Sequence, residues 1–300
     1  MASLRDLHMR MRAVRQTLQV TKAMNLISTS KLRRGRRMLE DIEPYFTRIQ
    51  KSMFDILSCA EKHDSNFFRA RNPVDSRTAI VVITSDKGLA GAYNANIFRY
   101  VGDLCGRIQN PVLLLVGAVG HRHYAYTCDA ILERYSFHSR LPTMEDAEKV
   151  SAYLISQYLC GAIDEVHVVY THMYNAVKIL PTEKQILPLD GDKIQAELFG
   201  TGNGQRVKLH FEFIPSEREV FDALIPRYVK GIIYGSMVEA YASEHSARMT
   251  AMNQASKSAE EMLVDLQTIY NRVRQTGITM EMAEIIGGSS ALVGGELQHD

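Results

Sequence analysis

Several residue types and patterns are scarce or missing in this chain of 300 residues. It has no tryptophan, and its cysteines are scattered without any CxxC pair: Cys59, Cys105, Cys128 and Cys160. This usage predicts buried free thiols in a reducing compartment rather than a disulfide framework. No apolar run approaches the roughly eighteen residues that a membrane span needs. Early charges exclude a signal peptide, and helical periodicity that begins almost at once predicts no added presequence.

Motifs of known catalytic chemistry are also missing. The chain holds no HExxH, no GxSxG, no GxGxxG and no GxxxxGK[ST] sequence, and no acidic pair at a convincing spacing. His121 and His123 could form a metal pair, but no third ligand of fitting spacing accompanies them, and His167 and His172 have the same standing. Surface histidines after a strand are the favoured interpretation. We therefore expect no catalytic group, no metal and no cofactor.

Charge is nearly balanced overall but unevenly placed. The formal net charge is +1, yet residues 1–40 hold ten Lys and Arg against two Asp and Glu, a local net charge of +8. Residues 234–287 hold seven acidic residues against four basic ones, a local net charge of −3. The basic stretch Lys31–Arg37 fits three hypotheses: nucleic-acid binding through phosphates, docking to an acidic protein surface, or a solvated basic face.

The stretch from Tyr234 to Gly287 contains no proline and steps its apolar residues at helical spacing. A seam with alternating steps of four and three is expected at Ala255, Ala259, Met262, Leu266, Ile269 and Val273. Such a helix would reach roughly 80 Å, about twice the width of a globular domain of this size. It therefore needs a partner. The small residues after Gly287 predict a weakly structured tail.

The N-terminal segment supplies that partner. Ser3 is a candidate N-cap, and the same alternation of three and four follows at Leu4, Leu7, Met11, Val14 and Leu18. The pattern then loosens through Met24, Ile27 and Leu32 and resumes from Leu39 to Ile56, with Pro44 expected to bend the helix or mark a joint. We predict one helix to about Lys62. We therefore predict that the helices at the two chain ends pair in an antiparallel coiled coil.

Between the two predicted helices the sequence has a different pattern of apolar residues. Strands are expected at residues 79–83, 111–116, 165–170, 178–186 and 207–213, with helices near 94–108 and 145–161. This alternation predicts a central Rossmann-like α/β domain with a largely parallel sheet. The expected domains are 1–62, 74–215 and 216–300. The turn Ser85–Gly91 could bind phosphate at a helix N-terminus, but a purely structural role for its glycines is favoured.

Four sequence blocks carry a family resemblance. They are Thr21-Lys-Ala-Met24 with Ser30-Lys-Leu-Arg-Arg34, Ser85-Asp-Lys-Gly-Leu-Ala-Gly-Ala-Tyr-Asn94, Ser243-Glu-His-Ser-Ala-Arg-Met-Thr-Ala-Met252, and Asn271-Arg-Val-Arg-Gln-Thr-Gly-Ile-Thr-Met-Glu-Met-Ala-Glu-Ile285. In this order they resemble the gamma subunits of F-type ATP synthases over nearly the whole chain. The cysteine insertion of chloroplast members is missing, so thiol control is not expected.

The resemblance implies a rotor without bond chemistry of its own. The terminal helices would form an axle inside the ring of alpha and beta subunits. The α/β domain would stand beside the epsilon subunit on the c-ring, and ion flow would turn both. The expected location is the cytoplasmic face of a bacterial plasma membrane, held peripherally through the complex, with no nucleic acid bound.

The resemblance also implies the residues that contact the ring. Lys22, Lys31 and Arg33 would face an acidic lever loop on beta, with Met24 at the family position near that loop. The opposing helix would contribute polar contacts that change with rotation, at Arg248, Arg274, Gln275, Thr279, Glu281 and Glu284. Some of these residues could instead only hold the two helices together.

Two other functions remain open on the residues alone. The first is a basic coiled-coil protein that binds nucleic acid through its N-terminal end, which requires tight binding with a steep dependence on salt. The second is an α/β enzyme that acts through the Ser85–Asn94 turn, which requires ligand binding by the isolated chain.

Overall fold

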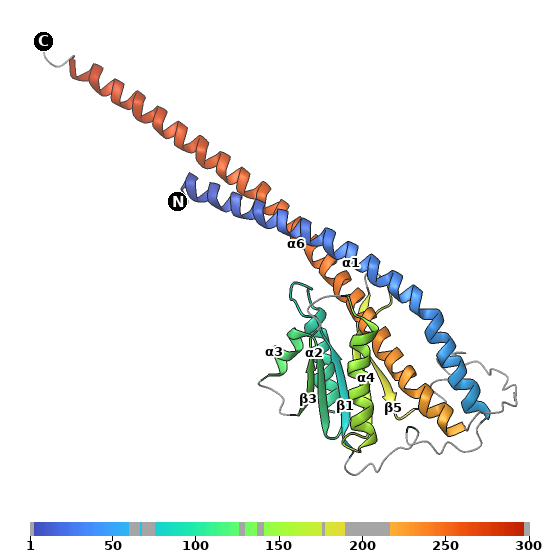
Figure 1. The fold of residues 1–300 in the computed structure, drawn as a ribbon. Coiled ribbons are helices and arrows are strands. Elements are labelled where there is room, and N and C mark those ends of the chain that lie inside the picture. The colour runs from blue at the N-terminus through green and yellow to red at the C-terminus, as the bar shows by residue number, and fades with distance from the viewer. Residues whose placement is uncertain are drawn as a thin grey trace. The chain divides into compact units, whose positions relative to one another are not determined.

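The computed structural model describes residues 3–59, 67, 76–125, 130–136, 141–175, 178–189 and 217–296 (Figure 1). The chain forms two compact units, one of residues 1–27 with 250–300 and the other of residues 28–249. Two long helices, α1 (Leu4–Cys59) and α6 (Glu217–Glu296), contribute to both units.

The first helix begins with a reciprocal cap. The Asp6 N–H donates to Ser3 Oγ (3.2 Å), and the Ser3 N–H donates to the Asp6 carboxylate (3.3 Å), so the predicted N-cap is confirmed. The helix continues through Pro44 and ends at Cys59, slightly before the expected Lys62. Proline removes one backbone hydrogen bond, but the side chains of Ile42 and Ile49 pack on the core on both sides of it.

The last helix is longer than the sequence pattern indicated. It begins at Glu217, continues through Pro226 and ends only at Glu296, so the expectation of a weakly structured tail after Gly287 was wrong. The physical reason is that glycine costs a helix only about 1 kcal/mol relative to alanine, and no proline stands in the tail to stop the helix.

Five described strands form one sheet in the order β3-β2-β1-β4-β5. They are β1 (Thr78–Ile83), β2 (Pro111–Val116), β3 (Ile131–Tyr135), β4 (Glu165–Met173) and β5 (Ile179–Leu187). All neighbours pair in parallel except β4 with β5. The predicted strand at 207–213 lies outside the described residues, and β3 was not predicted.

Helices cover both faces of this sheet (Figure 1). On β1, Ile80 and Val82 pack with residues of α2 (Tyr93–Cys105), while Val81 and Ile83 point to the opposite face. There they join residues of α4 (Met144–Leu159), α1 and α6 in the larger core. Parallel strands with helices on both faces are the doubly wound arrangement. The predicted fold class, a coiled coil of the chain ends with a Rossmann-like domain, is confirmed.

His121 and His123 lie in a short helix, α3 (Ala118–Tyr124), which follows β2 directly. His123 is exposed and its ring stacks on Phe98 at 3.8 Å, so the expected surface position after a strand holds. The expectation of buried thiols needs correction: Cys160 is exposed and Cys105 is half-buried, and neither forms a disulfide.

Gly117 offers a test of the packing between β2 and α3. Its φ is +107°, and a Cβ there would lie 2.3 Å from the Thr84 carbonyl oxygen. We expect Gly117→Ala to lower the free energy of unfolding by about 1–3 kcal/mol from backbone strain alone, measured by urea denaturation. The control is Gly102→Ala in α2, where a Cβ meets nothing within 4 Å; it should raise stability by about 0.5–1 kcal/mol. Equal effects would contradict this packing.

Candidate functional site: the terminal helix pair and the turn after β1

In the unit formed by the chain ends, α1 and α6 pack along a narrow seam. On α1 the least exposed positions include Leu7, Met11 and Thr21, which continues the predicted alternation of three and four. On α6 the less exposed positions include residues 252, 256, 259, 263, 266, 270 and 273. The predicted seam therefore holds at Ala259, Leu266 and Val273, and Ala255 is half-buried. Met262 is 52% exposed and Ile269 45% exposed, which corrects those two positions.

Polar side chains fix the register of this pairing. The Ser256 hydroxyl donates to Thr21 Oγ1 at 2.8 Å, and both side chains are buried. Beside them, Lys22 Nζ lies 2.7 Å from Glu260 Oε1, with both side chains more than half exposed. An exposed pair of this kind contributes about 0–1 kcal/mol. A groove of about 510 Å³ opens here, lined by Lys22, Asn25, Leu26, Asn253, Ser256, Lys257 and Glu260.

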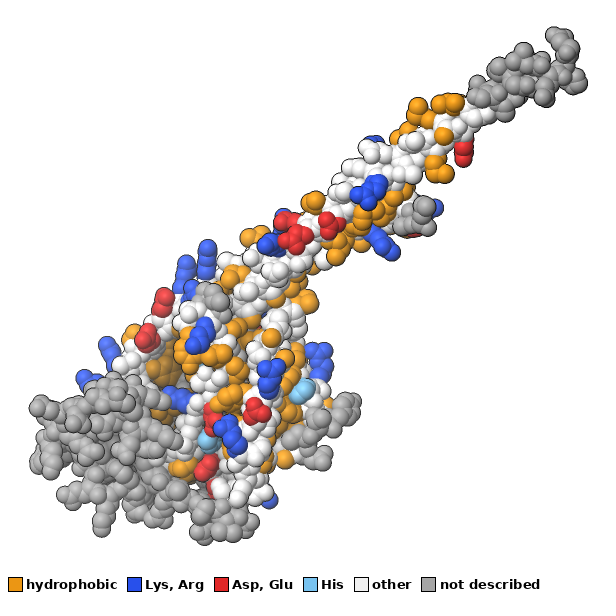
Figure 2. Space-filling view, turned by 180° about the vertical axis from the view of Figure 1, so that it is seen from behind, with side chains coloured by type: hydrophobic (Ala, Val, Ile, Leu, Met, Phe, Trp, Pro, Cys, Tyr) orange, Lys and Arg blue, Asp and Glu red, His pale blue; other side chains and the backbone are white. Residues whose placement is uncertain are grey.

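Beyond Val273 the end of α6 extends past the N-terminal end of α1 (Figure 1). All five predicted contact residues of this segment are exposed: Arg274, Gln275, Thr279, Glu281 and Glu284. Large apolar side chains are exposed with them, including Ile278, Met282 and Ile285, which share one face at helical spacing. Met280 lies on the opposite face and is also exposed. Figure 2 shows hydrophobic side chains along this part of α6.

The remaining predicted contact residues lie on α1. Met24 and Lys31 are half-buried and Arg33 is exposed. Lys31 is close enough to the α6 residues Glu244 and His245 to affect their pKa values.

In the other unit, the turn after β1 is held by its own side chains. The Ser85 N–H donates to Asn94 Oδ1 (3.1 Å), and the Ser85 hydroxyl donates to the Lys87 carbonyl (2.8 Å). Leu89 and Gly91 have positive φ values of 62° and 58°. Gly91 adopts its positive φ without the steric cost that a side chain brings there, which supports the structural interpretation at this position.

The side chain of Arg248, in α6, donates hydrogen bonds to this turn. Its Nη2 donates to the Lys87 carbonyl (3.0 Å) and the Gly88 carbonyl (3.1 Å), and its Nε also donates to Gly88 (3.3 Å). Its Nη2 also lies 2.6 Å from Glu244 Oε1. The arginine is only 6% exposed, so its contacts lie within this chain. Arg248 was expected on a contact surface, whereas here it ties a helix to a turn.

Burial sets the charge states around Arg248. Burial raises the pKa of the Glu244 carboxyl, and the charge of Arg248 offsets part of that rise. Burial, together with the charges of Arg248 and Lys31, lowers the pKa of His245 to about 3. The imidazole is therefore neutral at pH 7, and its Nδ1 accepts from Arg248 Nη1 at 3.2 Å.

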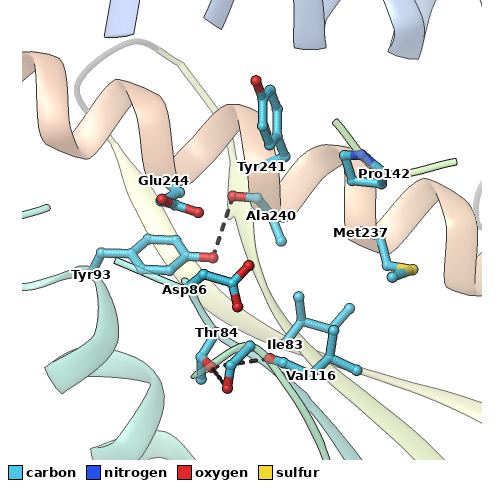
Figure 3. Close-up of a pocket in the computed structure, with 11 residues that line it drawn as sticks. Ile83, Thr84, Asp86, Tyr93, Val116, Pro142, Met237, Ala240, Tyr241 and Glu244 are labelled. Carbon is cyan, nitrogen blue, oxygen red and sulfur yellow. Dashed lines mark hydrogen bonds between the residues drawn. The ribbon is translucent and has the colours of Figure 1, made fainter. Parts of the chain in front are cut away.

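A small cavity lies beside this cluster, at the carboxyl ends of β1 and β2 (Figure 3). Asp86, Tyr93 and Glu244 line it, and the Tyr93 hydroxyl donates to the Ala240 carbonyl at 3.3 Å. Its volume of about 50 Å³ has room for a few water molecules and not for a nucleotide. The cavity therefore gives no support to an enzyme that acts through the Ser85–Asn94 turn.

Sequence reasoning named Arg248 and the turn but missed the partners that join them. Glu244, Ser243 and Asn94 stand inside the sequence blocks that carried the resemblance, which was the available signal. The hydrogen bonds of Arg248 to the turn span 160 and 161 residues of sequence, which no periodicity reveals. Within the described part of the chain, no group of three or more His, Cys, Asp or Glu side chains could hold a metal ion, and no helix is long and apolar enough to span a membrane.

Comparison with known proteins identifies the family. A family model described as ATP synthase matches residues 3–292. The ATP synthase gamma chain of Ruminiclostridium cellulolyticum is 37% identical over 97% of this chain and 99% of its own length. The gamma chain of Acetivibrio thermocellus is 34% identical over 97% of this chain and all of its own. The chain belongs to the ATP synthase gamma-chain family. Nothing in these comparisons supports the nucleic-acid alternative.

Solved structures agree with the gamma-chain fold. A chain of the Euglena gracilis mitochondrial ATP synthase, in a structure of OSCP, F1 and the c-ring, superposes with a TM-score of 0.69 and 17% identity. The match covers 98% of this chain and 95% of that chain. A chain from the central stalk and c-ring of the Tetrahymena thermophila mitochondrial enzyme gives a TM-score of 0.59 at 24% identity, over 79% of this chain and 99% of that one.

The neutral state of His245 makes stability depend on pH. Its pKa is about 3 in the folded chain against 6.5 normally, so the unfolded state binds the proton more readily. This contribution is complete above pH 6.5 and is lost as the pH falls toward 3. Between pH 7 and pH 5 the parent chain should lose about 2 kcal/mol more stability than His245→Asn, measured by urea denaturation. The variant retains Glu244, so the difference isolates His245. Parallel curves for both chains would contradict a buried neutral imidazole.

Proposed function

We propose that this chain is the central-stalk rotor of an F-type ATP synthase, which couples ion flow through the membrane sector to ATP synthesis. Residues 1–62 and 216–300 would form the axle, and residues 74–215 the base. The chain itself would perform no bond chemistry. Its location would be the cytoplasmic face of a bacterial plasma membrane, bound peripherally through the complex.

The observation that carries this proposal is the exposure of large apolar side chains at the C-terminal end of α6. Ile285 is 71% exposed and Met280 60% exposed, on opposite faces of one helix. Contiguous exposed apolar surface marks a site that a partner covers, and apolar side chains on opposite faces need a partner on more than one side. A protein ring that surrounds the helix meets this need. Membership of the gamma-chain family makes the alpha and beta subunits the proposed ring.

The proposed base carries a different set of contacts. We infer that it lies against the c-ring, because the Tetrahymena thermophila chain that shares the fold comes from the central stalk and c-ring of that enzyme. The family resemblance adds the epsilon subunit as a proposed neighbour. Torque that arises in the membrane sector would enter the chain through this domain. The axle would then transmit it to the ring.

Polar residues on the axle would make the rotation productive. Lys22, Met24, Lys31 and Arg33 on α1, and Arg274, Gln275, Thr279, Glu281 and Glu284 on α6, are the proposed contacts with alpha and beta. An axle drives a conformational cycle only if its contacts favour different beta conformations by different free energies. Side chains of unequal charge around one helix provide such differences.

Reversal of one charge tests this role. Glu281→Lys should assemble but lower ion pumping per ATP hydrolysed by about fivefold, the effect of a coupling free energy of about 1 kcal/mol. The measurement is ATP-driven proton or sodium uptake by vesicles that hold the complete complex, divided by the hydrolysis rate. Asp103→Lys is the matched control, because Asp103 is exposed on α2 of the base, and pumping per ATP should not change.

Two different results would reject the role of Glu281 and the rotor function itself. Unchanged pumping per ATP in assembled Glu281→Lys complexes would reject the role of Glu281 alone. A tagged copy of the chain that brings down neither alpha nor beta subunits would reject the rotor itself.

A further inference from the structure

Polar contacts between α6 and the sheet gather on one short part of the helix, from Glu239 to Arg248. The Ser243 hydroxyl donates to the Thr171 carbonyl at 2.8 Å. The Met173 N–H donates to the Glu239 carboxylate at 3.3 Å, and His172 Nδ1 also contacts that carboxylate. The Tyr93 hydroxyl donates to the Ala240 carbonyl, and Arg248 donates to the turn after β1. This cluster is called the α6 bracket below.

The bracket ends on rigid parts of the base. Thr171, His172 and Met173 close β4, and the turn from Ser85 to Gly91 follows β1. These two strands are neighbours in the sheet and pair in parallel, so both ends of the bracket rest on one hydrogen-bonded surface. The turn is braced separately by Ser85 and Asn94. A force on the bracket would therefore load the sheet rather than a loose loop.

Large apolar side chains of α6 that pack in the core, such as Ile233 and Val238, precede the bracket, and Tyr241 is buried within it. The helix presents small side chains here, among them Ala240, Ala242 and Ser243, all of them buried. Small side chains interdigitate little, and the hydrophobic effect has no direction. Hydrogen bonds require alignment, so they resist rotation of the helix about its own axis. Arg248 donates through a planar guanidinium to two adjacent carbonyls, a geometry that lysine cannot reproduce.

We propose that Arg248 is the positioning residue of a joint that transmits torque from the base to α6. This inference rests on the proposed rotor function and adds to it the place where the force passes. Arg248 and Ser243 hold α6 at a fixed angle on the ends of β1 and β4. Glu244 holds the guanidinium in place through the 2.6 Å ion pair. Next along the same helix comes the segment from Thr250, which pairs with the N-terminal end of α1.

Torsional stiffness of the assembled complex tests the joint. The exposed Cys160, at the end of α4, serves to attach a bead to the base once the other three cysteines are replaced in every protein compared. The alpha–beta ring is fixed to a surface, and the angular fluctuation of the bead during pauses gives the stiffness. Arg248→Lys should lower the stiffness by roughly one third, because hydrogen bonds to charged groups are among the stronger ones. ATP hydrolysis should continue.

Two further variants complete the experiment. Ser243→Ala removes one neutral hydrogen bond of the bracket and should lower the stiffness by a smaller amount, which decides the matter if Arg248→Lys fails to assemble. Lys230→Met is the matched control: it breaks a partly exposed ion pair between α6 and Glu148 of α4, 3.5 Å long, outside the bracket. It should leave the stiffness unchanged. A residue that only stabilises the fold would lower thermal stability without a change in stiffness.

The results of this experiment distinguish a failure of the proposed joint from a failure of the proposed rotor function. Equal stiffness for the parent, Arg248→Lys and Ser243→Ala in rotating complexes would overturn the joint and leave the rotor standing. A parent complex that binds the ring but never rotates the bead would overturn the proposed function. A drop in stiffness for Lys230→Met equal to that for Arg248→Lys would also overturn the joint, since it would show that the bracket has no special role.

Discussion

The close approach of α1 and α6, through small and polar side chains, is the interaction on which the rest of the structure depends. In the unit of residues 28–249, a Cβ at Gly35 would lie only 3.2 Å from the Cβ of Ala242, and one at Gly231 would overlap the Phe46 ring. In the unit of the chain ends, Thr21 and Ser256 meet through a hydrogen bond. Large side chains at these positions would push the helices apart. Close packing of this kind fixes the register.

The sequence allowed much of this pairing to be predicted, and the errors have a physical cause. The α1 seam was predicted correctly at Leu7 and Met11 because apolar side chains mark it. On α6, two lines of residues at the same spacing share Ala259, Leu266 and Val273. The buried line also contains Ser256 and Tyr270, whereas the other contains Met262 and Ile269, so hydrophobicity favoured the wrong line.

The sheet was predictable where its strands are buried on both faces and not elsewhere. Residues 79–83 and 111–116 are continuous apolar runs, and both became central strands. The edge strand β3 reads Ile-Leu-Glu-Arg-Tyr, is mostly half-exposed or exposed, and lacks such a run. The candidate site was predictable only in its parts. Composition indicated that the Ser85–Gly91 turn was special, but only the fold brings Arg248 to its carbonyls.

The charge cluster on α6 is better explained by orientation than by stability. Withdrawing Glu244 and Arg248 from water is costly, and well-packed apolar side chains in place of a buried ion pair are often as stable or more so. Apolar side chains would leave the Lys87 and Gly88 carbonyls without the guanidinium, and α6 would be free to settle at several angles. Directional bonds select one of these angles. For a rotor that must deliver torque without slipping, a single fixed angle of α6 matters more than the last few kcal/mol of stability.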